Sequence, residues 1–181
     1  LKTAQTGAVE KARKALYGMF SRCYALGLHN VNMQCHLFDT LVRPLMCYGC
    51  EVWAVDWLAD MCRSGNVASG RAEELVHKPF LRQSLGVCKS TPVAAMYHDL
   101  GRYPVTMFWL RMAAQLWNRA LARPSSDWLR IMLDANIDLA CDSSVPLARR
   151  QRLWGFHFTK CMTLLGETWQ STMGIKLHID C

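Results

Sequence analysis

The spacing of apolar residues constrains the fold of this chain more than any other feature. Apolar side chains recur at steps of three and four residues through most of the sequence, which is the period of an amphipathic helix. Alternation of β-type residues between turns is found only weakly, in the tail 175–179. The sequence therefore predicts an all-α fold, an irregular bundle of about seven helices.

Glycine, proline and capping residues divide this pattern into separate helices. Pro44 is expected to kink or break a helix, because an interior proline lacks the N–H and clashes with the preceding turn. Gly27, Gly86 and Gly101 stand where helices are expected to end. The predicted helices are 8–26; one from a cap at Asn30 or Asn32 to Pro44; 45–57; 72–85, despite Pro79; one from a Thr91 cap to Leu100; 104–121; one from Asp127 to 139 with a Ser125 or Ser126 cap; and 146–165.

Two of these helices carry basic faces. Lys11, Lys14 and Arg22 fall within about 80° of one another at 100° per residue, and Gly18 lies between them. Such a face is suited to binding a phosphate backbone. An ordinary solvent-exposed face accounts for the three cations about as well. The last helix repeats the arrangement opposite its apolar side. The candidate nucleic-acid-binding residues are Lys11, Lys14, Arg22, Arg149, Arg152 and Lys160.

Other helical faces are expected to be buried. Leu37, Phe38, Leu41 and Val42 are predicted to point inward from the second helix, and most tryptophans lie on apolar faces. The tryptophans assigned to the core in this way, and not to base stacking, are Trp53, Trp57, Trp109, Trp117 and Trp154.

Composition limits the class of protein. A chain of 181 residues, half of them apolar, suits one domain or two small ones, and a net charge of +7 favours polyanionic partners. We expect no transmembrane helix, because no run of 18 uncharged apolar residues occurs. Nine dispersed cysteines suit free thiols in a reducing, intracellular compartment. Leu1 is not a start methionine, and the first residues are typical of the middle of a longer chain.

Recognisable catalytic patterns are missing from the sequence. The carboxylates are scattered, and Asp134, Asp138 and Asp142, four residues apart, are more typical of a solvated face than of a metal site. Cys47 and Cys50 have zinc-type spacing without a second Cys/His pair, so core packing is the better interpretation. The six histidines belong to no motif. We therefore expect no catalytic residue, metal, cofactor or small-molecule substrate for this chain.

Positions 37–53 carry the most specific motif. An apolar helix runs through proline into Tyr-Gly-x-Glu-x-Trp, with Pro44, Tyr48, Gly49, Glu51 and Trp53 as its defining residues. This string resembles the segment after the palm of non-LTR (LINE-type) retrotransposon reverse transcriptases. Two more blocks of that family, a Lys-Ala-x-x-Ala-Leu helix and His-x-x-Phe-Leu-Arg-x-x-Leu-Gly, are matched at 11–16 and 77–86, and 97–104 resembles a third.

The resemblance implies a division of the chain and a role. Residues 1–63 would be thumb-like helices, 64–70 a loop, 71–123 a helical linker and 124–181 C-terminal helices with little similarity to the family. The family's paired aspartates lie in the palm, and no Tyr/Phe-x-Asp-Asp string occurs here. The chain would be a non-catalytic fragment of an RNA-directed DNA polymerase that uses Mg²⁺ and dNTPs.

The resemblance also names partners. They are an RNA template–DNA primer duplex or a DNA duplex, gripped by the basic helices, and the missing fingers and palm of the same polyprotein, in the nucleus or a cytoplasmic ribonucleoprotein. Glu51 is expected to hydrogen-bond an arginine, an indole N–H or helix N-terminal amides, because a buried carboxylate needs partners. The alternative is a helical structural or protein-interaction domain, including a decayed retroelement relic with no activity.

Overall fold

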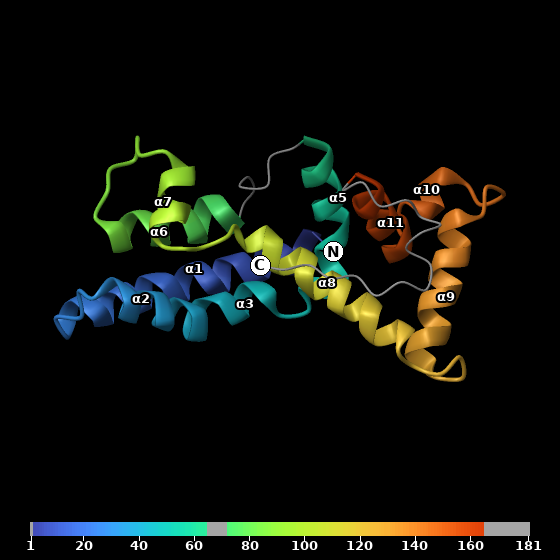
Figure 1. Cartoon of the computed structure of the whole chain (residues 1–181), viewed down its shortest axis with the longest axis horizontal. Helices are drawn as coiled ribbons and strands as arrows, with labels where there is room; N and C mark the ends of the chain where they lie inside the picture. Colours follow the sequence, from blue (N-terminus) through green and yellow to red (C-terminus); the bar gives the residue numbers. More distant parts are fainter. Residues whose placement is uncertain (1, 65–71, 165–181) are drawn as a thin grey trace. The chain divides into compact units, whose positions relative to one another are not determined.

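The computed structural model describes residues 2–64 and 72–164, and every regular element within these ranges is helical (Figure 1). The all-α class is thereby confirmed. The expected loop was 64–70; Ser64 is the last residue of a helix, and 65–70, like the tail at 175–179, lies outside the described residues. The chain forms two compact units. Within the described residues, unit 1 takes 2–49 and 72–108, and unit 2 takes 50–64 and 109–164. The units are built from alternating segments, whereas the sequence suggested consecutive ones.

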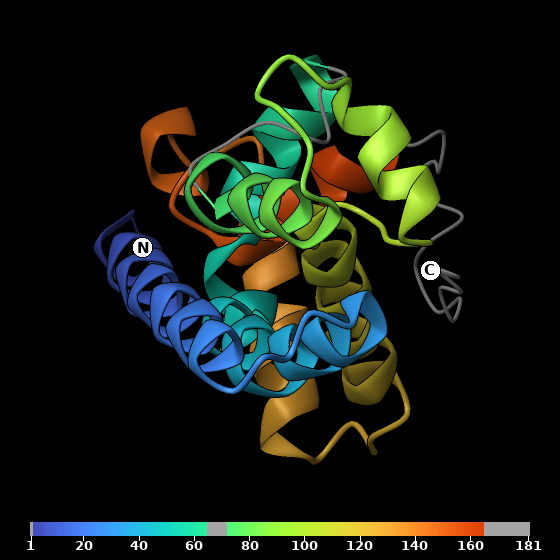
Figure 2. The ribbon, with the colours of Figure 1, turned by 90° about the vertical axis from the view of Figure 1, so that its left-hand side faces the viewer.

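Unit 1 is organised around its first helix. In Figures 1 and 2 the long helix α1 runs beside the segment that contains α2, η1 and α3, and α1 also contacts η2. Val9, Ala12 and Leu16 on the inner face of α1 are at most 1% exposed, as the apolar spacing predicts. The elements of unit 1 are α1 (Lys2–Ala25), α2 (Val31–Leu37), η1 (Phe38–Val42), α3 (Arg43–Cys47), η2 (Glu73–His77), α6 (Lys78–Leu85), α7 (Val93–Asp99) and the start of α8 (Val105–Leu121).

Two prolines explain the π-helical turns η1 and η2. Each turn is followed by a cation and a proline, Arg43-Pro44 and Lys78-Pro79. Proline has no N–H and clashes with the carbonyl four residues earlier, so the backbone widens to bonds five residues apart. Accordingly, the N–H of Arg43 donates to the Phe38 carbonyl, and that of Lys78 donates to the Glu73 carbonyl. The helix thus passes through Pro44 by widening.

At this widened turn the structure differs from the expected burial of Leu41. Phe38 and Val42 are 1% and 0% exposed, as expected, but Leu41 is 53% exposed and Leu37 is half-buried. The expectation for Leu41 assumed regular α-helical register. A π turn rotates the following residues relative to that register.

The predicted helix 45–57 is interrupted at Tyr48 and Gly49. Tyr48 is extended, with φ −62° and ψ 114°, and Gly49 has a φ of +65°. Glycine adopts this left-handed conformation without the steric penalty of a Cβ atom. α3 therefore ends here, and the chain forms a separate helix, α4 (Cys50–Trp53), in which Glu51 is the second residue. The predicted continuous helix is wrong at this point.

Unit 2 has a core of aromatic and small residues. Its elements are α4 (Cys50–Trp53), α5 (Val55–Ser64), the remainder of α8, α9 (Trp128–Cys141), α10 (Leu147–Arg150) and α11 (Trp154–Leu164). Trp117 and Trp154 stack on Phe158 at centroid distances of 5.2 and 4.6 Å. Trp53 and Trp57 each form a T-shaped contact with Trp109. The expected core role is confirmed for Trp53, Trp109 and Trp117, whereas Trp57 and Trp154 are only partly buried.

Several helix ends differ from the predictions. Asn30 caps α2 as expected, by accepting the Met33 N–H at 3.1 Å. The N-cap of α7 is Pro92, one residue later than the predicted Thr91, and Asp127 itself caps α9 through the Leu129 N–H. The predicted helix 146–165 is two helices, α10 and α11, joined by a turn at 151–153.

Candidate nucleic-acid interface

A strip of cations follows the outer surface of α1. Lys11, Lys14 and Arg22 are all exposed, as their positions opposite the buried face require. Gly7 and Gly18 lie on the same arc, and a Cβ atom at either position would meet nothing within 4 Å. We call Gly7, Lys11, Lys14, Gly18 and Arg22 the basic strip. The two glycines remove side chains that would hold a phosphate backbone away from the helix.

The positive charge of the basic strip is not compensated locally. Among the described residues, Lys11, Lys14 and Arg22 form no ion pair, because the nearby carboxylates are engaged elsewhere. The carboxylates of unit 1 that are so engaged are Glu10 with Arg13, Asp39 with Arg43 and Arg102, Glu73 with His77, Glu74 with Lys78, and Asp99 with His98. A surface of this kind attracts polyanions and leaves its cations available for phosphates.

Exposed aromatic residues flank the basic strip. Tyr17 and Tyr24, seven residues apart on α1, are 59% and 82% exposed. Residues at this spacing lie on one helical face about two turns apart. A strand that follows the cations would therefore pass beside two exposed tyrosine rings, and exposed aromatic rings beside a basic groove are typical of surfaces that stack bases.

The second set of predicted cations is not brought together as expected. Arg149 and Arg152 are exposed near the end of α10, and Lys160 is half-buried on α11, which is a different helix. The single face that was to hold all three does not exist. Gly155 explains the break, because its N–H donates to Asn136 Oδ1 at 2.7 Å and its backbone lies so close to α9 that a Cβ atom would come within 3.0 Å of that oxygen.

Acidic residues lie near this second set. Asp142 accepts the Ser144 main-chain N–H at 2.8 Å, and hydrogen bonds from the Ser144 side chain and main chain lower the pKa of its carboxyl. Arg150 is close enough to contribute to the same lowering, so part of the local positive charge is offset. The basic strip on α1 is therefore the stronger candidate for binding phosphates.

The motif residues have mainly structural positions. Pro44 lies in the first turn of α3, Gly49 supplies the left-handed turn, and Trp53 is 8% exposed against Trp109. Tyr48 is 85% exposed.

The partner predicted for the Glu51 carboxylate is not found at one of its two oxygens. The Trp154 indole N–H donates to the main-chain carbonyl of Glu51 at 2.7 Å, and the carboxylate Oε2 is buried with no hydrogen-bond partner in the described structure. An indole N–H was one of the predicted partners, but the Trp154 indole binds the main chain of Glu51 and not its carboxylate.

Sequence reasoning missed a buried polar cluster in unit 1. Glu73 is 0% exposed; its Oε2 accepts the Tyr97 hydroxyl at 2.5 Å and lies 3.2 Å from His77 Nδ1, and its Oε1 accepts the Val105 N–H. Burial and the neighbouring Glu73 raise the pKa of Tyr97 above its usual value, so the phenol stays a donor. We call Glu73, His77 and Tyr97 the buried triad. The four-residue spacing of Glu73 and His77 was the available signal.

The buried triad connects elements of unit 1 to one another, and its reactive groups are not exposed to solvent. His77 is 2% exposed and stacks on Phe38 at 5.5 Å, while Phe38 stacks on Phe80 at 4.1 Å. Glu73 thereby links η2, α7 and the first residue of α8. Because the cluster is enclosed by aromatic rings, it has the features of a structural anchor.

Other candidate chemistry gives no site. Within the described ranges, no three His, Cys, Asp or Glu side chains are grouped as metal ligands. Cys50 is buried, and Asp134, one of the three aligned aspartates, accepts a two-oxygen contact from Arg130 Nε at 3.0 and 2.8 Å. None of the described helices is long and apolar enough to cross a membrane.

Comparisons with protein-family models, with curated proteins and with solved structures found no match for this chain.

Proposed function

We propose that this chain is a nucleic-acid-binding helical region of a LINE-type reverse transcriptase, in which the basic strip on α1 contacts the phosphates of an RNA template–DNA primer duplex. The observation that carries the proposal is the set of three exposed cations that have no carboxylate partner within the described residues, with Gly7 and Gly18 on the same face of α1. The resemblance of the sequence around Pro44 to the post-palm segment of that family supports the choice of partner. This chain would bind the duplex, and the fingers and palm of the same polyprotein would carry out the catalysis.

The charge pattern sets the expected strength of binding. Each phosphate neutralised on a duplex releases counterions, and the slope of log K against log salt is about −0.9 per contact. Three contacts through Lys11, Lys14 and Arg22 then contribute about −2.7 to the slope, which is roughly a 40-fold loss of affinity between 50 and 200 mM salt.

Fluorescence anisotropy with a labelled RNA–DNA duplex tests the proposal. The variant Lys11→Glu/Lys14→Glu/Arg22→Glu should abolish binding or lower the magnitude of the salt slope by about 2.7. The control variant Arg111→Glu/Arg119→Glu/Arg123→Glu makes the same change of charge at exposed arginines of unit 2 and should retain the slope. Both variants should keep the helical circular dichroism of the parent.

Three results would refute the proposal. They are no binding to the duplex at low salt, binding that does not weaken with salt, and equal losses in the two triple variants. The second and third would show that the basic strip is an ordinary solvated face.

A further inference from the structure

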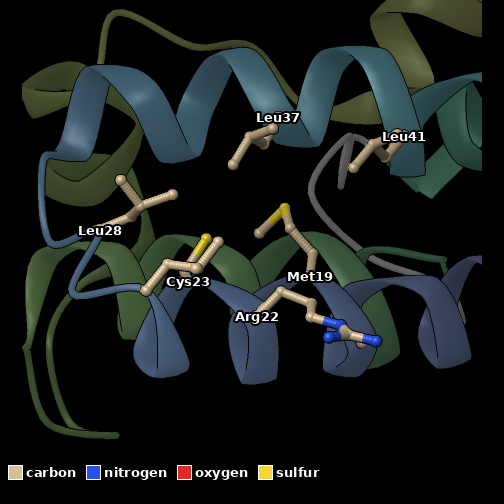
Figure 3. A pocket seen from close by; sticks show the side chains of 8 residues that line it. Met19, Arg22, Cys23, Leu28, Leu37 and Leu41 are labelled. Atoms are coloured by element: carbon tan, nitrogen blue, oxygen red, sulfur yellow. The ribbon is translucent and has the colours of Figure 1, made fainter.

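An apolar groove lies beside the basic strip, between α1 and the segment formed by α2 and η1. Its volume is about 270 Å³. Figure 3 shows Met19 and Cys23 reaching up from α1, Leu37 and Leu41 pointing toward them from the opposite helix, and Leu28 closing one end. Arg22 is the one charged residue of the lining, which Gly18 and Leu26 complete. We call this the α1–η1 groove.

Large apolar side chains that are exposed to solvent border the groove. Leu26 on α1 is 71% exposed, and Leu41 on η1 is 53% exposed. Met33 and Leu45 continue the row of Leu37 and Leu41 at four-residue spacing and are 46% and 37% exposed. The row from Met33 to Leu45 extends roughly 18 Å at 1.5 Å per residue. The register change of the π turn at η1 keeps Leu41 in this row.

The lining selects the kind of occupant. The volume is slightly below the range of about 300–1,000 Å³ that is usual for small-molecule sites, which also offer several placed polar groups. A nucleobase needs hydrogen bonds along its edge, and apart from the Arg22 guanidinium the groove side chains are apolar or, at Cys23, a thiol. The occupant that fits the groove best is a helix with aliphatic side chains at three- or four-residue spacing, as in helix-in-groove recognition.

The charge beside the groove favours acidic residues along one edge of the bound helix. Arg22 lines the groove, and Lys14 and Lys11 follow on the same surface of α1 without an ion-pair partner in the described residues. A carboxylate on the facing edge of an incoming helix would complement them, and a cationic edge would be repelled.

We propose that the α1–η1 groove binds an amphipathic helix of a partner protein, with an aliphatic row in the groove and acidic residues against Arg22. This inference does not rest on nucleic-acid binding. Because Arg22 belongs to both surfaces, an acidic helix and a duplex would compete for the chain.

A designed peptide tests the groove. The probe is a fluorescein-labelled, N-acetylated helical peptide of about 15 residues, with leucines three and four residues apart and glutamates along one margin; a second peptide has lysines in place of the glutamates. The acidic peptide should bind the full chain in an anisotropy titration, and the lysine peptide should bind at least several-fold more weakly. Arg22→Glu should remove that preference.

Neutral substitutions separate the groove from the basic strip. Leu41→Asn and Leu26→Asn, on opposite banks, should each weaken binding of the acidic peptide about fivefold or more and leave duplex binding unchanged. Leu139→Asn changes a leucine of α9 that is 44% exposed and should have no effect on the peptide. Each variant replaces an exposed side chain, and its circular dichroism should match the parent.

Several outcomes would overturn the proposal. Failure of both peptides to bind, equal binding of the two peptides, or binding that survives both asparagine variants would each do so. Self-association of the chain that Leu41→Asn abolishes would assign the groove to a second copy instead. Binding to anionic vesicles that depends on Leu41, without peptide binding, would assign it to a lipid surface.

Discussion

Removal of the Glu73 carboxylate should destabilise unit 1 strongly. In Glu73→Ala, the Tyr97 hydroxyl, the Val105 N–H and His77 Nδ1 all lose their common partner inside the core. Hydrogen bonds to charged groups contribute about 1.5–3 kcal/mol each, so three would contribute about 4.5–9 kcal/mol. Relief of the cost of burying the carboxylate offsets part of this, and removal of one member of a buried pair typically costs about 3–5 kcal/mol. We expect a loss of about 3–5 kcal/mol.

The chain offers a matched control for this substitution. Glu74 is the next residue, its side chain is 56% exposed, and it forms an ion pair with Lys78. The Lys78 side chain is only 12% exposed, but the Glu74 carboxylate lies at the surface, where ion pairs contribute about 0–1 kcal/mol, so Glu74→Ala should cost much less than Glu73→Ala. Glu73→Gln keeps an acceptor for the Val105 N–H and should fall between the two alanine variants.

Urea unfolding can locate the loss as well as measure it. Six of the seven tryptophans lie in the described part of unit 2 and none in that of unit 1, so tryptophan fluorescence mainly reports unit 2, whereas circular dichroism reports helix in both. For Glu73→Ala, the loss of helix should begin at lower urea than the change in fluorescence. A cost below about 1 kcal/mol, or one equal to that of Glu74→Ala, would refute the assignment of Glu73 as the anchor of unit 1.

Two further predictions concern unit 2 and the cysteines. Gly155→Val should cost about 1–3 kcal/mol in thermal or urea unfolding, because its Cβ atom would crowd Asn136; an unchanged stability would show that α9 and α11 separate freely. Cys88 and Cys141 are both exposed, but hydrogen bonds from the Ser90 and Thr91 side chains lower the pKa of Cys88, whereas burial and then Asp138 raise that of Cys141. As pH rises, alkylation by iodoacetamide, followed by mass spectrometry, should therefore begin at lower pH for Cys88, and the reverse order would contradict the assignment.

Local features of the fold could be predicted from the sequence. The inner face of α1 follows from the three- and four-residue spacing of Ala12, Leu16 and their neighbours, which needs no distant partner. The helix ends at Gly27 and Gly86 could also be predicted from the sequence, because a left-handed residue after a helix is a property of the local backbone. The exposure of Lys11, Lys14 and Arg22 follows from the same periodicity.

Features that depend on distant partners could not be predicted. The end of the last helix pattern at 151–153 depends on Asn136, which binds the Gly155 N–H from another helix. The buried triad joins Glu73 to Tyr97 and Val105, 24 and 32 residues away in sequence. Leu41 was assigned to the core because the periodicity of an α-helix hides the register change of a π turn. The function of the basic strip stays a prediction, because exposure and lack of ion pairs are conditions for phosphate binding and not binding itself.

The alternating construction of the two units has a consequence for synthesis of the chain. The apolar face of α5, with Val55, Leu58 and Ala59 at most 1% exposed, contacts α11. Trp154, which opens α11, is 103 residues beyond the Glu51 carbonyl that it binds. At about 5–20 residues per second, a ribosome needs roughly 5–20 s to produce that distance. During this interval α5 has left the exit tunnel ahead of its partner, and its apolar face is available to chaperones or to a neighbouring nascent chain.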